Sequence, residues 1–181
     1  NGVVISTAAN NQNYPEIAAD GSAGAIVTWQ DYRGGSYYDI YAQRVNASGA
    51  VQWTANGVAS CTAANYQRYP RIATDVSGGA IITWEDYHNG NVADIYSQRV
   101  NASGIVQWTA NGVAICTATN AQLLPQIVSD AVGGALIMWQ DSRGGGNSDL
   151  YIQKVNASGG VPWISNGVAV CTASSSEINQ Q

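Results

Sequence analysis

The stretch Pro15–Asn46, PEIAADGSAGAIVTWQDYRGGSYYDIYAQRVN, decides the fold, because the chain contains it three times. It returns from Pro70 as PRIATDVSGGAIITWEDYHNGNVADIYSQRVN and from Pro125 as PQIVSDAVGGALIMWQDSRGGGNSDLYIQKVN. One unit of this size buries its apolar face poorly, so we expect the copies to stack on one another. The chain is therefore predicted to be an array of one supersecondary unit.

A period of 55 residues sets the boundaries of the repeats. The tripeptide NGV marks each start, at Asn1, Asn56, Asn111 and Asn166. We predict one repeat domain, residues 1–181, which holds the repeats 1–55, 56–110 and 111–165 and the beginning of a fourth repeat, 166–181.

Each repeat is expected to form four antiparallel strands, because apolar residues alternate at a period of two and turn residues interrupt them. In the first repeat the expected strands are Tyr14–Asp20, Gly24–Asp31, Asp39–Val45 and Ala50–Thr54. The following segment, GVxxxTA, is either an extension of the last strand or the crossing to the next repeat. Four-stranded antiparallel units at this spacing are typical of β-propeller blades, so the predicted fold class is all-β with three blades.

Tryptophans and cysteines recur at fixed positions of the repeat. Trp29, Trp84 and Trp139 lie in the most apolar strand and are expected in the core, and Trp53, Trp108 and Trp163 are expected to pack between blades. Cysteines at one repeat position lie a full repeat apart, farther than the roughly 7 Å between Cα atoms that a disulfide allows. We therefore expect buried free thiols at Cys61, Cys116 and Cys171.

Composition restricts the partners and the location. Charged residues are 10% of the chain and the net charge is −5, with a single lysine, so no basic surface for nucleic acid is expected. No apolar run is long enough to span a membrane, which needs about 20 residues. The neutral polar composition favours an extracellular or cell-surface location. No signal pattern precedes the first repeat, so either a signal was removed or the chain is a piece of a longer protein.

All nine aspartates fall at three positions of the repeat. They are Asp20, Asp75 and Asp130; Asp31, Asp86 and Asp141; and Asp39, Asp94 and Asp149. The functional alternative is a repeated cation site, but calcium gathers about six to eight oxygens and two aspartates per loop fall short. The structural alternative is favoured: Asp31 bonds Arg33 and loop N–H groups, and Asp20 caps the first turn. No metal and no cofactor are predicted.

A family resemblance rests on the pattern P-x-I-x-x-D, G-A-[IL]-[IV]-x-W-x-D-x-R, D-[IL]-Y-x-Q-[RK] and G-x-V-x-W. This pattern is similar to repeats of secreted bacterial β-propellers and distantly resembles blades of the sialidase (BNR, Asp-box) superfamily. The Asp-box reads S-x-D-x-G-x-x-W, whereas Ser48, Ser103 and Ser158 stand in place of its Asp. The resemblance implies three converging arginines in an active site; Arg33 and Arg143 fit, but His88 occupies the third position.

Residues that break the repeat are the candidates for chemistry, because a reaction centre is asymmetric. They are Glu16, Arg68, Arg71, Glu85, His88 and Met138. Glu85 and His88 have the types of a carboxylate and a base. Their loop counterparts in the other repeats are Gln or Arg, which indicates ordinary drift, so no catalytic residue is predicted.

Loop tyrosines offer a binding site, because flat rings beside polar groups can hold a sugar. The candidate ligand-binding residues are Tyr32, Arg33, Tyr37, Tyr38, Tyr87, His88 and Arg143. The alternative is an ordinary protein interface, where tyrosine is also common. Asn46, Asn101 and Asn156 each begin the glycosylation sequon N-A-S, and the competing interpretation, a hairpin turn, is favoured.

Three blades leave apolar faces at both ends, whereas closed propellers have about four to eight blades. We therefore expect a homo-oligomer, such as two copies in a six-bladed ring, or further blades of a longer chain. The surplus NGV segment could be a strand exchanged between chains. The predicted function is a non-enzymatic extracellular structural or adhesion module that assembles through its blade edges. The alternatives are a lectin-like propeller that binds a glycan and a sialidase-like glycoside hydrolase or its relic.

Overall fold

The structure, a computed structural model, describes residues 2–172 and contains three four-stranded antiparallel sheets. The strands of blade 1 are β1 (Gln12–Ala19), β2 (Ala25–Asp31), β3 (Asp39–Val45) and β4 (Val58–Cys61). Those of blade 2 are β5 (Gln67–Thr74), β6 (Ala80–Asp86), β7 (Asp94–Val100) and β8 (Val113–Cys116). Those of blade 3 are β9 (Gln122–Ser129), β10 (Ala135–Asp141), β11 (Asp149–Val155) and β12 (Val168–Cys171). The predicted all-β repeat fold is confirmed.

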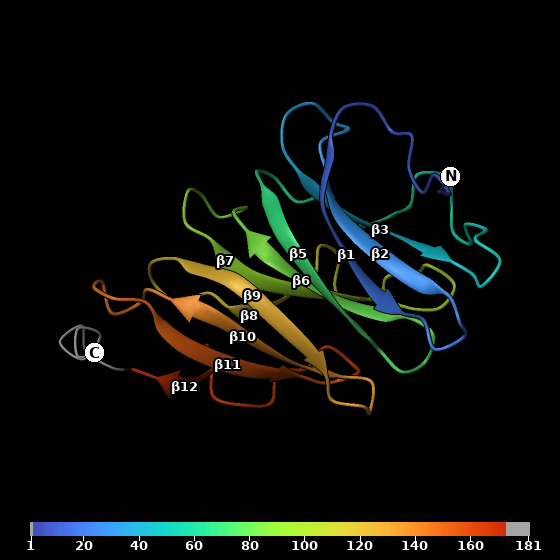
Figure 1. Ribbon diagram of the computed structural model, residues 1–181. Helices are drawn as coiled ribbons and strands as arrows, with labels where there is room; N and C mark the ends of the chain where they lie inside the picture. The colour runs from blue at the N-terminus through green and yellow to red at the C-terminus, as the bar shows by residue number, and fades with distance from the viewer. Residues whose placement is uncertain (1, 173–181) are drawn as a thin grey trace, which may run out of the picture.

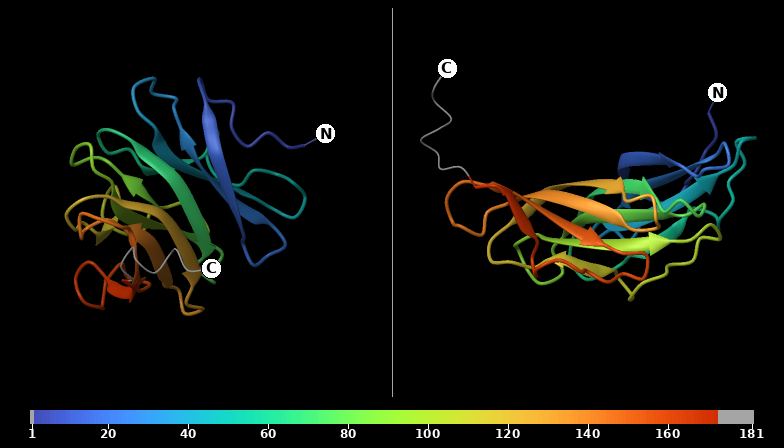
Figure 2. Two further views of the ribbon diagram at one scale, coloured as in Figure 1. Left: turned by 60° about the vertical axis from the view of Figure 1, so that its left-hand side comes forward. Right: turned by 90° about the horizontal axis from the view of Figure 1, so that it is seen from below.

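The three sheets form a fan of propeller-like blades (Figure 1). The first strands of the blades, β1, β5 and β9, lie side by side and make the main contacts between neighbouring sheets. Within each blade the strands follow in sequence order out to β4, β8 or β12. Blade 1 and blade 3 lie at opposite ends of the fan (Figure 2). The chain therefore has a first blade and a last blade, each with one face turned away from its neighbour.

The prediction of a strand at Ala50–Thr54 was wrong. Val51 makes only an isolated bridge with Val45, and the fourth strand is the later segment Val58–Cys61. The reason is the buried Gln43: its Nε2 donates to the Thr54 carbonyl at 2.9 Å, and its Oε1 accepts the N–H of Trp53 at 3.0 Å. Because a side chain satisfies this backbone, residues 50–54 form a loop that turns the ring of Trp53 towards blade 2.

The conformation of the NGV segment explains why this segment recurs in each repeat. Asn56 and Gly57 both have positive φ, 65° and 85°, which form the turn before β4. A Cβ on Gly57 would lie 2.6 Å from the Ala42 carbonyl oxygen and 2.7 Å from Cη2 of Trp29. Only glycine fits this approach, so the segment is fixed by packing on the core tryptophan.

The hydrophobic core lies between the blades. One cluster joins Ile26 and Trp53 of blade 1 to Ile82 and Trp84 of blade 2, and the equivalent cluster joins blades 2 and 3. All seven residues of β6 are buried, because blade 2 is covered on both faces. Stability therefore comes from stacking, as expected for a repeat array.

The burial predicted for the tryptophans and cysteines is confirmed except at Trp163 and Cys171 of the last blade. Trp53 and Trp108 are 8% and 9% exposed, and Cys61 and Cys116 are each 1% exposed. Trp163 is 39% exposed, and Cys171 is exposed. These two predictions were wrong because no blade covers this face of blade 3 in the described part of the chain. All three cysteines are free, and burial raises the pKa of the Cys116 thiol to about 12.

Candidate functional site

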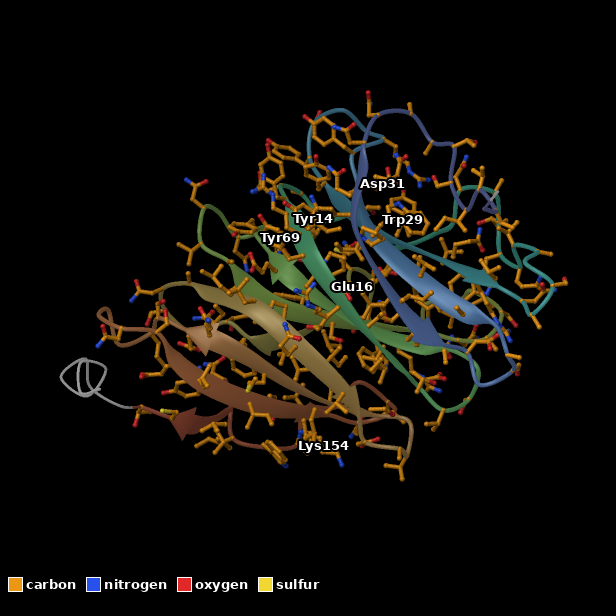
Figure 3. The ribbon with its side chains drawn as sticks, viewed as in Figure 1. Tyr14, Glu16, Trp29, Asp31, Tyr69 and Lys154 are labelled. Atoms are coloured by element: carbon orange, nitrogen blue, oxygen red, sulfur yellow. The ribbon has the colours of Figure 1, made fainter. Side chains whose placement is uncertain are left out.

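The loop between β2 and β3 is held by the buried carboxylate of Asp31. Its Oδ2 accepts the indole N–H of Trp29 at 2.7 Å, and Arg33 donates Nε to Oδ1 at 2.9 Å and Nη2 to Oδ2 at 2.7 Å. Trp29 and Asp31 lie together at the end of β2 (Figure 3). The guanidinium also covers the Tyr41 ring at 3.6 Å and donates to the Asn56 carbonyl. Burial opposes ionisation, but the bonds from Arg33 and Trp29 outweigh it and lower the Asp31 pKa.

The other two blades repeat this arrangement. Arg143 makes the same forked contact with Asp141, at 2.6 Å between Nη2 and Oδ2, and lies 3.7 Å over the ring of Tyr151. In blade 2 the Nδ1 atom of His88 lies 2.6 Å from Oδ1 of Asp86. Arg33, His88 and Arg143, three of the seven predicted ligand-binding residues, are thus each engaged by an aspartate of their own loop.

A second set of aspartates holds the β1–β2 turn and its counterparts. Asp20 accepts the N–H groups of Ser22 and Gly24, each at 2.8 Å, and pairs with Arg44 at 2.8 Å. The bond from Ser22 leads the interactions that lower the Asp20 pKa. Arg44 also donates across the junction to the Ala102 carbonyl at 3.1 Å. The expected turn bonds of Asp20 and Asp31 are therefore present.

Asp39 behaves differently from Asp31, its partner in the ladder of β2 and β3. Burial, followed by the negative charge of Asp31, raises the pKa of Asp39 to about 6. Burial likewise raises the pKa of Asp94 in blade 2. Asp149 occupies the matching place opposite Asp141 in blade 3. Among residues 2–172, no three His, Cys, Asp or Glu side chains converge in a way that could hold a metal ion.

Glu85 and His88 use different partners. Oε1 of Glu85 accepts the N–H of Leu124 at 2.8 Å, and its Oε2 accepts the hydroxyl of Tyr87 at 3.2 Å. His88 contacts Asp86 and the edge of the Tyr96 ring. Burial raises the pKa of Glu85 despite these bonds. The carboxylate joins blade 2 to blade 3, whereas the imidazole holds its own loop.

The loop tyrosines of blade 1 meet residues from the beginning of blade 2. Tyr32 and Tyr38 lie 4.8 Å apart between ring centroids, and Tyr37 meets Tyr66 edge to face at 5.0 Å. The guanidinium of Arg68 lies 3.8 Å over the Tyr66 ring. Tyr14 and Tyr69 form a further edge-to-face pair at the adjacent ends of β1 and β5 (Figure 3). Tyr66 was missed in the sequence because it belongs to the next repeat, and only blade stacking brings it here.

The N-A-S segments form turns held by their asparagines. Oδ1 of Asn46 accepts the N–H of Ser48 at 3.1 Å and that of Ala50 at 2.9 Å, while Gly49 has φ 82°. Asn101 and Asn156 make the same pair of backbone bonds. The asparagine acts through its side chain, and only the glycine has positive φ. Glycosylation at these three asparagines stays a prediction.

Both end blades carry apolar surface. The trailing face, the side of blade 3 turned away from blade 2, has two hollows that meet at Ile152. One is lined with Leu136 and Met138, and the other with Trp163 and Val168. The leading face, the side of blade 1 turned away from blade 2, carries half-buried Val27 and Val45 and a hollow lined by Ile5, Ser6, Gln12, Pro15 and Trp29.

The chain matches no model of a known protein family and no curated protein sequence. The resemblance to sialidase-like blades therefore stays a prediction. In the part of the chain that the structure describes, no helix is long and apolar enough to cross a membrane.

Proposed function

We propose that this chain is a non-enzymatic, extracellular structural module that assembles head to tail with further copies of itself. One observation carries the proposal. The trailing and leading faces are the two halves of an interface that the chain already forms twice, between blades 1 and 2 and between blades 2 and 3. A second copy therefore presents to each end face the same kind of surface that a neighbouring blade presents within the chain.

The tryptophan of the outer loop supplies the first recurring contact. Trp53 donates its Nε1 to the Ala102 carbonyl at 3.0 Å, and Trp108 donates to the Ala157 carbonyl at 3.1 Å. The next donor in this series is the exposed Trp163. The equivalent acceptor position in the first repeat, 55 residues before Ala102, is Ala47. In the assembly, Trp163 of one copy donates to Ala47 of the next.

A buried side-chain oxygen supplies the second contact. Oε1 of Gln30 accepts the N–H of Tyr69 at 3.2 Å, and Oε1 of Glu85 accepts that of Leu124 at 2.8 Å. Both donors lie at a bulge with positive φ. Gln140 is the exposed third acceptor, and Tyr14 is the bulge residue of blade 1. These two groups meet when the copies join.

Apolar packing completes the interface. Val27 and Val45 stand where Ile82 and Val100 of blade 2 pack against blade 1. On the trailing face Met138 and Ile152 are bulkier than their counterparts Thr28 and Ala42, whereas Val27 is smaller than Ile82. Burial contributes about 25 cal/mol for each Å² of apolar surface, so covering both faces favours association.

Head-to-tail contacts either close into a ring or continue as a filament. Two copies give six blades, which is within the range of about four to eight found in closed propellers. The six-bladed ring is therefore the assembly that we propose.

The NGV segments determine how the ring closes. Thr7 donates its N–H to Oδ1 of Asn56, as Thr62 does to Asn111 and Thr117 does to Asn166. The segment before Thr7 therefore lies on blade 1 where the outer strand of a preceding blade belongs. At the junction between copies it competes with β12 of the neighbour for one place. Deleting either the segment before Thr7 or β12 should be tolerated, because the other can fill the shared place, whereas deleting both should abolish assembly. Loss of assembly after a single deletion would contradict this competition for one place.

The contact itself is tested by Trp163→Ala in light scattering. The variant should have the mass of a single chain, because both the indole donor and its apolar surface are lost. Tyr37→Ala is the matched control, since it removes an exposed aromatic ring that packs on Tyr66 within the chain and lines neither end face, so the variant should assemble normally. A Trp163→Ala variant that assembles as the unmodified chain does would overturn the proposed interface.

A further inference from the structure

We propose that the junction between blades 1 and 2 binds a saccharide that carries a carboxylate, such as a uronic acid unit, through Arg68 and the tyrosines around it. This site is formed within one chain and does not depend on the assembly proposed above. It is called the Arg68 site below and consists of Tyr37, Tyr38, Tyr66, Arg68 and Tyr87.

The charge of Arg68 is the first reason. Among residues 2–172, it is the one basic side chain without a carboxylate partner. The paired ones are Arg33, Arg44, Arg71, His88, Arg99, Arg143 and Lys154. The buried Nε of Arg68 also has no hydrogen-bond partner. A guanidinium binds a carboxylate through two parallel hydrogen bonds, and no carboxylate of the described residues forms an ion pair with Arg68, so a ligand carboxylate would supply this partner.

The nearest acidic group does not fill this role. Glu85 is 1% exposed, and its two oxygens accept the Leu124 N–H and the Tyr87 hydroxyl. Burial raises its pKa, and burial together with the charge of Glu85 raises the pKa of Tyr87 to about 12. Tyr87 therefore stays a neutral donor to Glu85 at physiological pH, and among the described residues no ion pair joins Glu85 to Arg68.

Aromatic rings are the second reason. Arg68 lies 3.8 Å from the ring centre of Tyr66 and 5.9 Å from that of Tyr87. Tyr37 is 43% exposed and stands at right angles to Tyr66, so its ring is open to a ligand. The hydroxyl of Tyr38 accepts a bond from Asn13 at 3.0 Å, which orients it. Flat rings with a few fixed polar groups are typical of small-molecule sites, and the C–H face of a sugar ring suits them.

The third reason is that the site occurs once. At the junction of blades 2 and 3, the positions of the five site residues hold Val92, Ala93, Ala121, Leu123 and Ser142. None of these is aromatic or charged. The shared fold therefore does not need the Arg68 site, and the arginine and its aromatic neighbours are an addition to one junction only.

Calorimetric titration with an oligosaccharide of glucuronic acid tests the proposal. The unmodified chain should bind it, and Arg68→Leu, which copies Leu123 of the third repeat, should bind about tenfold more weakly. Arg71→Gln is the matched control, because Arg71 is already paired with Glu16 and its loss should leave binding unchanged. Urea unfolding of each variant shows whether the fold is kept.

Further ligands show whether both the carboxylate and the sugar ring are needed for binding. A neutral glucose oligosaccharide should bind more weakly than the acidic one, and Tyr37→Ala should weaken binding of the acidic one. Equal binding of the neutral sugar, equal binding of an aspartate-rich peptide, or full binding by Arg68→Leu would each overturn the assignment. Absence of binding by the unmodified chain would do the same.

Discussion

Blades 2 and 3 have the same strand pattern but different burial. Every residue of β6 is buried, whereas Leu136 and Met138 of β10 are half-buried and Gln140 is exposed. Trp108 is 9% exposed, and Trp163, one repeat later, is 39% exposed. The difference arises from the neighbour, because blade 2 is covered on both faces and blade 3 on one. In a repeat array, burial is therefore a property of the interface more than of the blade.

The largest effect should come from the core of the middle blade. Trp84→Ala removes a fully buried ring between blades 1 and 2 and should lower the free energy of unfolding by about 3–5 kcal/mol. Trp163→Ala, measured in a dilute single chain, should cost less than about 1 kcal/mol because the ring is partly exposed. Urea denaturation compares the two variants, and equal losses would contradict the role assigned to the interface.

The aspartate anchors should come next. Asp141→Ala leaves the Arg143 guanidinium and the Trp139 indole N–H without their partner and should cost about 3 kcal/mol. Asp86→Ala in the middle blade should cost less, because the side chain that loses its carboxylate partner is a histidine and not an arginine. Unfolding midpoints measure both variants. A larger loss for Asp86→Ala would show that the covered position of the blade outweighs the partner.

Asp39 and its counterpart Asp94, whose pKa values are raised by burial, should change the pH dependence of stability. The pKa of Asp39 is about 6 in the folded chain and about 3.9 in an unfolded one, so the folded state binds more protons between these values. This group therefore makes stability fall as the pH rises from about 4 to 7. Asp39→Asn should gain about 1 kcal/mol at pH 7, after allowance for solvent screening, and nothing at pH 4.

Asp94→Asn is the control in the middle blade. It should gain less, because Asn89 donates a hydrogen bond to Asp94 at 3.3 Å and this bond weakens in the variant. Asp31 has the opposite sign: its lowered pKa contributes stability above about pH 4 that is lost as the pH falls through the folded value. Urea midpoints measured from pH 4 to 8 separate these contributions. A difference in midpoint between Asp39→Asn and the unmodified chain that does not change with pH would contradict the account.

The smallest effect should come from the ion pair across the first junction. Arg71 and Glu16 lie 2.7 Å apart, with side chains 28% and 39% exposed, and the second junction has Gln126 in the place of Arg71. Arg71→Gln introduces the residue that blade 3 has at this position, removes the ion pair and should cost less than about 1 kcal/mol. The loss should shrink in high salt, and a salt-independent loss would indicate packing of the arginine stem instead.

The repeat, the all-β fold and the first three strands could be predicted because local periodicity encodes them. The fourth strand could not, since the side chain of Gln43 reaches ten residues ahead to bond the backbone of Trp53. Burial of Trp163 and Cys171 was predicted from their repeat position, but it depends on a neighbour that the described chain lacks.

The sites show the same limit. Loop position suggested Arg33 as a ligand contact, but the aspartate two residues earlier engages its guanidinium. Arg68 broke the repeat and was visible for that reason, whereas its contact with Tyr66 became visible only with the neighbouring tyrosines in space. Sequence patterns located the positions that differ between copies, and the fold showed which of them lie together.

Light scattering of the unmodified chain over a wide range of dilutions tests the central claim most directly. The head-to-tail interface predicts twice the chain mass of 18.9 kDa, which corresponds to a six-bladed ring. A mass of three or more times that of the chain would support the interface but would show an assembly larger than the ring of two copies. A mass of 18.9 kDa at every concentration would contradict the account.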